Sequence, residues 1–168
     1  RALEIYEDLL ERDPESEVRM SQVAMTLNNL GNLLYRMGRL EEARGLFERA
    51  LEIYEDLLER DPESEVRMSQ VAMTLNNLGA LLYRMGRLEE ARGLFERAFE
   101  MGIRLLERDP ENKARISLVI TTLDNLRNLL YQMGKPEDAL RVLQKAEGFY
   151  KRLTKGRPDS GDLDVNTG

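Results

Sequence analysis

The stretch RALEIYEDLLERDPESEVRMSQVAMTLNNLGALLYRMGRLEEARGLFE, residues 49–96, decides the fold because residues 1–48 repeat it with one difference, Asn32 in place of Ala80. Residues 97–144 form a third copy that keeps half of these 48 residues. A fixed period of this length is typical of repeat proteins, in which each unit packs against its neighbours. The sequence therefore predicts an array of similar units.

Apolar residues within one unit recur every three or four positions, the spacing of one face of an α-helix. One stripe, called the A helix, is Met68, Val71, Leu75, Leu78, Leu82 and Met85, and another, called the B helix, is Leu40, Ala43, Phe47, Ala50, Tyr54 and Leu57. We expect Asp61 to be the N-cap of the A helix, with Pro62 in its first turn, and Gly86 to end it. The pattern predicts an all-α fold of about seven helices, alternating B and A.

The residues that recur between copies resemble the tetratricopeptide repeat, a pair of antiparallel helices. The resemblance rests on Leu30-Gly31, Leu34, Gly38, Ala43, Phe47 and Ala50, and on Leu78-Gly79, Leu82, Gly86, Ala91, Phe95 and Ala98. The small residues stand where helices approach closely. The usual period is about 34 residues, so a 48-residue period resembles a long-helix variant, each unit being longer by about two heptads. This resemblance implies an α-solenoid, a superhelix of stacked helix pairs.

The repeat boundaries predict one array over residues 1–155, followed by a disordered tail over residues 156–168. We expect the array to comprise a partial repeat with one B helix (1–12), two full repeats (13–60 and 61–108) and a C-terminal capping repeat (109–155). The third copy and its extension hold all the lysines, and Arg127 replaces Gly79 there. Two interpretations stay open for this basic end: a cap whose sequence has drifted, or a docking site for an acidic partner.

Composition excludes several classes of function. The chain has no Cys and no His, so thiol nucleophiles, imidazole bases and Cys/His metal sites are excluded. A net charge of −6 disfavours nucleic acid, and no apolar run is long enough to cross a membrane. The carboxylate pairs, such as Glu41-Glu42, are expected to stabilise helix N-termini. We therefore predict no catalysis, no metal and no cofactor, and a cytoplasmic location.

The resemblance implies a binding surface, because in this family the A helices line the concave side and partner segments lie across them. Asn can donate to and accept from a peptide backbone, Tyr offers a rigid face, and Arg can grip carboxylates. The predicted partner-binding residues outside the buried stripe are Asn28, Asn32, Tyr35, Arg36, Met73, Asn76, Tyr83, Arg84, Asp124, Asn128 and Tyr131.

These residues predict a non-catalytic scaffold that binds a protein or peptide. The alternative is a structural spacer or a self-assembling rod, in which the open helix at residues 1–12 docks on another molecule. Duplication alone also explains identical residues in identical copies, so the recurrence of a residue type does not by itself establish binding.

Overall fold

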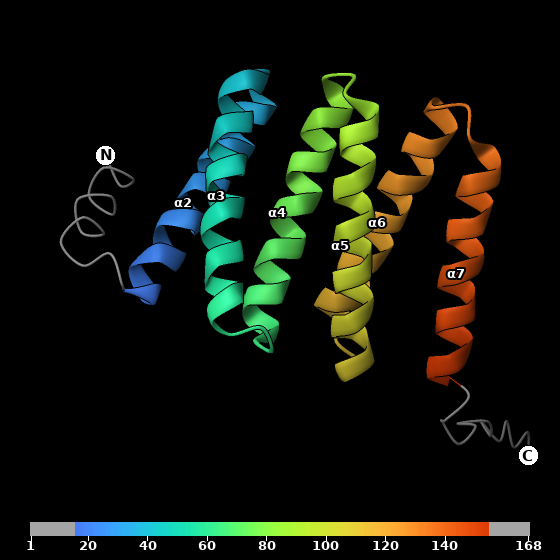
Figure 1. Cartoon of the computed structure of the whole chain (residues 1–168). Coiled ribbons are helices and arrows are strands. Elements are labelled where there is room, and N and C mark those ends of the chain that lie inside the picture. The colour runs from blue at the N-terminus through green and yellow to red at the C-terminus, as the bar shows by residue number, and fades with distance from the viewer. Residues whose placement is uncertain (1–15, 155–168) are drawn as a thin grey trace, which may run out of the picture.

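The computed structural model describes residues 16–154, which form α-helices joined by short turns (Figure 1). The helices are α2 (Glu17–Arg36), α3 (Leu40–Arg60), α4 (Glu65–Arg84), α5 (Leu88–Arg108), α6 (Lys113–Gln132) and α7 (Pro136–Thr154). The predicted A helices are α2, α4 and α6, and the predicted B helices are α3, α5 and α7. These six helices confirm the all-α repeat fold. The predicted helix at residues 1–12 and the predicted tail at 156–168 lie outside the described residues.

Each A helix ends in a turn built on a glycine. Gly86 has φ +79°, and its N–H donates to the Tyr83 carbonyl at 3.0 Å, while the Arg87 N–H donates to the Leu82 carbonyl at 2.9 Å. This left-handed backbone suits a residue without Cβ, and the two bonds satisfy carbonyl groups left free at the helix end. The prediction that Gly86 ends the A helix is confirmed.

The A helices begin later than the sequence predicts. Ser64 is the N-cap of α4, and its hydroxyl accepts a hydrogen bond from the Arg67 N–H at 3.4 Å. Asp61 is instead the C-cap residue of α3, and its carbonyl accepts from the Ser64 N–H at 3.1 Å. The prediction of Asp61 as N-cap was wrong because Asp61 and Pro62 belong to the turn between the helices, and Ser64 satisfies the free N–H group.

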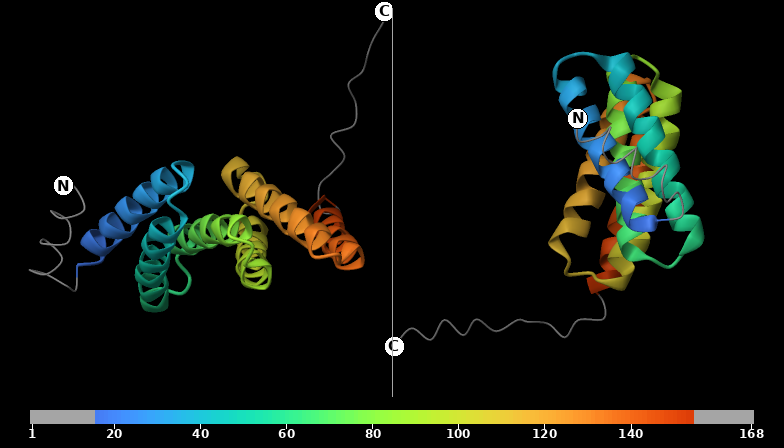
Figure 2. Two further views of the ribbon diagram at one scale, coloured as in Figure 1. Left: turned by 90° about the horizontal axis from the view of Figure 1, so that it is seen from above. Right: turned by 90° about the vertical axis from the view of Figure 1, so that its left-hand side faces the viewer.

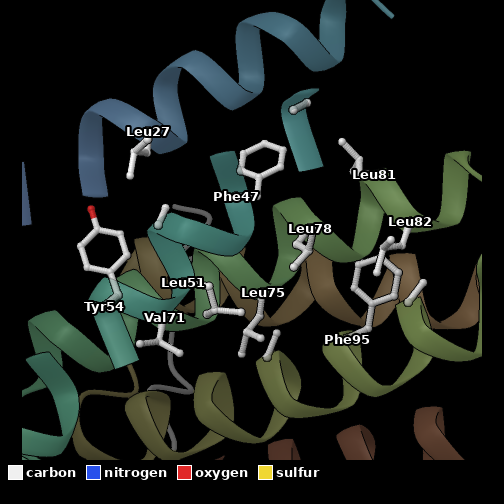
Figure 3. Close-up of a cluster of buried hydrophobic side chains, with 14 of the residues drawn as sticks. Leu27, Phe47, Leu51, Tyr54, Val71, Leu75, Leu78, Leu81, Leu82 and Phe95 are labelled. Carbon is white, nitrogen blue, oxygen red and sulfur yellow. The ribbon is translucent and has the colours of Figure 1, made fainter. Parts of the chain in front are cut away.

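Small residues allow the two helices of a pair to approach closely. A Cβ atom built on Gly79 would lie 2.7 Å from Cε1 of Phe95, and one built on Gly31 would lie 2.8 Å from Cε1 of Phe47. Both phenylalanine rings are buried. Figure 3 shows Phe47 in a cluster that joins neighbouring helix pairs. The predicted role of the small positions in close packing is confirmed for these two pairs.

The helix pairs stack side by side into a curved array (Figure 2). Seen from above in the left panel, α2, α4 and α6 lie along the inside of the curve, and α3, α5 and α7 lie along the outside. The third pair, α6 and α7, is packed less extensively than the pairs α2/α3 and α4/α5. Arg127 of α6 stands where the other pairs have glycine, and Leu143 of α7 stands where they have phenylalanine.

Candidate functional site

The predicted partner-binding residues all lie on the A helices, but they differ in accessibility. The exposed members are Arg36, Met73, Arg84, Asn128 and Tyr131. The half-buried members are Asn28, Asn32, Tyr35, Tyr83 and Asp124, and Asn76 is buried. The structure thus leaves part of the predicted surface open, and it uses other members for contacts within the chain.

Asn28 and Asn76 join neighbouring repeats. Nδ2 of Asn28 donates to Oγ1 of Thr74 at 2.6 Å, and Nδ2 of Asn76 donates to Oγ1 of Thr122 at 2.6 Å. Oδ1 of Asn76 also accepts from Nδ2 of Asn125 at 3.3 Å. The expectation that Asn76 lies outside the buried part of the helix is therefore corrected, because its amide is occupied by the next repeat.

We expect Asn76→Ala to lower the free energy of unfolding by about 1–3 kcal/mol, because it removes the hydrogen bonds that join Asn76 to the buried Thr122 hydroxyl and to the Asn125 amide. Urea denaturation followed by circular dichroism measures the loss. A double-mutant cycle with Thr122→Val should show a coupling energy that differs from zero. Additive effects of the two substitutions would show that this hydrogen bond does not stabilise the repeat junction.

Tyr35 and Arg84 contact each other across the junction between α2 and α4. The Arg84 guanidinium lies 5.1 Å from the centre of the Tyr35 ring, and its Nη1 donates to the Tyr35 carbonyl at 3.0 Å. A cation over an aromatic face is attracted by the ring electrons. These two side chains form a paired polar and aromatic feature at the surface.

Asp124 of α6 also has a partner within the chain. Its Oδ1 lies 3.2 Å from Nη2 of Arg127, one turn further along the same helix. Both side chains are partly exposed, so the pair contributes little to stability. The Arg127 side chain reaches solvent.

A hollow of about 330 Å³ lies between α4 and α6, and sequence reasoning found only part of it. Its lining includes the predicted residues Met73 and Asn76, together with Asn77, Ala114, Ser117, Leu118 and Thr121. The signal for the missed residues was their helical spacing: positions 114, 117, 118 and 121 share one face of α6. The hollow offers hydroxyl, amide and thioether groups beside an apolar floor.

The ionisable groups of residues 16–154 whose pKa is shifted belong to ion pairs or to the buried core. Within this range, no three carboxylates lie close enough together to hold a metal ion. Burial raises the pKa of the Tyr54 hydroxyl, and the hydrogen bond from Arg39 lowers the pKa of the Glu42 carboxyl. The ion pair of Arg39 and Glu42 lies at the first turn of α3, where acidic residues suit the helix N-terminus.

No helix of the described part has the length and apolarity that a bilayer crossing demands.

Comparison with known proteins agrees with the repeat geometry. Models of the tetratricopeptide repeat match residues 23–63 and residues 70–152. A search of curated protein sequences gave no match. Among solved structures, the crystal structure of BtubC (BKLC) from P. vanneervenii is similar with a TM-score of 0.62 and 22% identity, over 99% of this chain and 63% of that one.

The crystal structure of MamA gives a TM-score of 0.31 at 16% identity, covering 91% of this chain and 89% of that chain. The similarity to BtubC concerns the fold, and the present chain spans less than two thirds of that protein. The family models together match most of residues 16–154, the part of the chain that forms the helix pairs. The chain therefore belongs to the tetratricopeptide repeat family.

Proposed function

We propose that the chain is a non-catalytic scaffold that binds a peptide or an extended partner segment on the concave face of its A helices. Tetratricopeptide repeats generally mediate protein–protein interaction, and the family typically acts without catalysis. The observation that carries the proposal is the hollow between α4 and α6, two of the helices along the inside of the curve in Figure 2, because its lining combines apolar and hydrogen-bonding groups.

The contacts within the chain refine the set of residues available to a partner. Met73 is exposed on α4 and Ser117 is exposed on α6, and they border the hollow from opposite sides. Leu118 supplies part of the apolar floor. Hydroxyl and amide groups here can donate to and accept from an extended backbone, as in other peptide-binding grooves. Asn76 is a positioning residue, since its side chain holds α6 against α4.

We expect Met73→Asp combined with Ser117→Asp to weaken peptide binding at least tenfold. A bound peptide would have to remove water from two carboxylates at the edge of the hollow, which costs free energy. The probe is a set of peptides selected on the full chain from a random peptide display library. Fluorescence polarisation gives Kd for each of them. Both substituted positions are exposed, so the helices should keep their far-UV circular dichroism.

The matched control is Glu52→Ala combined with Glu100→Ala, which changes exposed residues on the outer helices α3 and α5. This control should leave Kd within twofold of the unmodified chain. If the selected peptides bind the Met73 and Ser117 variant as tightly as the unmodified chain, the concave face is not the binding surface.

A further inference from the structure

The junctions between neighbouring repeats share an arginine–carboxylate contact. Arg67 of α4 pairs with Glu17 of α2 and also donates to the Leu57 carbonyl. Arg115 of α6 pairs with Glu65 of α4 in the same way, and its Nη1 donates to the Leu105 carbonyl at 2.7 Å. In each junction, the earlier repeat presents a carboxylate and the A helix of the next repeat supplies the cation.

The junctions also share a polar and an apolar contact. The earlier repeat donates from an Asn amide to a Thr hydroxyl of the next A helix, as described for Asn28 and Asn76. Apolar side chains at these junctions are buried: Tyr54, at the first junction, is 3% exposed, and Ala72, at the second, is 0% exposed. The surface of each repeat that contacts the next helix pair therefore combines a carboxylate, an amide and an apolar strip.

The corresponding surface of the third repeat, which we call the trailing face, consists of Lys113, Ile120, Asp124 and Tyr150. Lys113 stands in place of Glu65, and Asp124 stands in place of Asn76. The apolar strip of this face consists of exposed side chains, since Ile120 is 54% exposed and Tyr150 is 66% exposed. Both residues also line an apolar hollow of about 230 Å³ between α5, α6 and α7. The charge pattern is thus altered while the apolar strip remains.

We propose that the trailing face binds an amphipathic helix of a partner protein that carries a carboxylate opposite Lys113 and an N–H donor opposite Asp124. The internal junctions support a helix as the occupant, because both equivalent surfaces are covered by the A helix of the next repeat. Lys113 and Asp124 define the chemistry of the partner helix. Opposite charges across an interface favour the matching partner, and like charges exclude other partners. This surface shares no residue with the hollow between α4 and α6.

The same charges disfavour a second copy of this chain. Its first described A helix, α2, carries Arg19 and Thr26 where α4 has Arg67 and Thr74. Arg19 would face Lys113, a like charge. The Thr26 hydroxyl already donates to the Gln22 carbonyl at 2.8 Å, so it has no proton left for Asp124. Stacking of identical chains would therefore bring two mismatched contacts into one interface.

The test uses the full chain with ¹³C-labelled isoleucine methyl groups and two helix-stabilised synthetic peptides. One peptide has the sequence of residues 64–86, and the other carries Arg67→Glu and Thr74→Lys in that sequence. Methyl resonances of Ile116 and Ile120 report binding at the trailing face, and Ile53 on α3 serves as the reference. We expect the altered peptide to shift the Ile120 resonance and to bind at least tenfold more tightly than the parent peptide.

A Lys113→Glu variant of the chain is the matched control, since it restores the residue found at Glu17 and Glu65. It should narrow the difference in affinity between the two peptides, because the parent peptide regains its ion pair at position 113 while the altered peptide keeps only its contact with Asp124. Glu at the first turn of α6 also suits the helix N-terminus, so the variant should stay folded. If neither peptide perturbs Ile120, if Ile53 shifts equally, or if the parent peptide binds the unmodified chain at least as tightly, the proposal is wrong.

Discussion

Phe95→Ala should lower the free energy of unfolding by about 3–5 kcal/mol, the range for removing a fully buried aromatic side chain. The Phe95 ring lies against the backbone of Gly79, where even an added Cβ would lie only 2.7 Å from it. Because α4 and α5 already approach closely along their remaining contacts, the structure cannot collapse fully into the space that the ring leaves. Urea denaturation followed by circular dichroism measures the change.

The repeats supply controls for this prediction. Phe47→Ala should cost a similar amount, since Phe47 packs against Gly31 in the same manner. In the third pair the equivalent residue is Leu143, which is only half-buried, and Arg127 takes the place of the glycine. Leu143→Ala should therefore cost clearly less than Phe95→Ala. A loss below about 1 kcal/mol for Phe95→Ala would contradict the packing role assigned to the ring.

The helices and their buried faces could be predicted from the sequence because both follow from local patterns. A spacing of three and four residues determines which side of a helix is apolar, and Val71, Leu75 and Phe47 are buried as that spacing predicts. The glycine turns were also predictable, since Gly86 occupies a position that requires positive φ. The helix starts were not, because Asp61 and Ser64 are both good capping residues and only their backbone geometry separates them.

The binding surface was harder to predict because it depends on which residues of the next repeat lie opposite. The polar side chain of Asn76 suggests exposure, but Thr122 of the following A helix takes its amide into a buried hydrogen bond. Ser117 and Leu118 border a hollow that exists only where α6 lies beside α4. Residue type and helical spacing identify a face of one helix, whereas the site arises from the relative placement of two.

The changed charges of the trailing face also could not be interpreted without knowing which residues of the next repeat lie opposite the equivalent positions. Lys113 and Asp124 read as ordinary polar substitutions when the copies are aligned. Their possible role in binding can be inferred only from the contacts of the equivalent residues, Glu65 and Asn76, which bind Arg115 and Thr122 in the next repeat. The sequence left open whether the basic third copy is a drifted cap or a docking site for an acidic partner. The proposed partner helix, with a carboxylate opposite Lys113 and an N–H donor opposite Asp124, is derived from these junction contacts.

Leu81→Ala should lower the free energy of unfolding by about 2–5 kcal/mol, whereas Leu33→Ala should change it by less than about 0.5 kcal/mol. The two leucines occupy the same position in almost identical copies, yet Leu81 is 0% exposed and Leu33 is 54% exposed. Figure 3 shows Leu81 in the cluster with Phe47, a residue of the preceding helix pair. Leu33 lies on α2, the first described helix, and its side chain faces solvent.

Matched denaturation curves of the two variants measure the difference. Intrinsic helix propensity cannot produce it, because the exchange of Leu for Ala is the same and the two copies differ only at the preceding residue, Asn32 or Ala80. An unequal loss therefore reports the contribution of the neighbouring repeat, as expected when stability is a sum of units and the interfaces between them. Equal losses at the two positions would mean that burial by the preceding pair does not determine stability in this array.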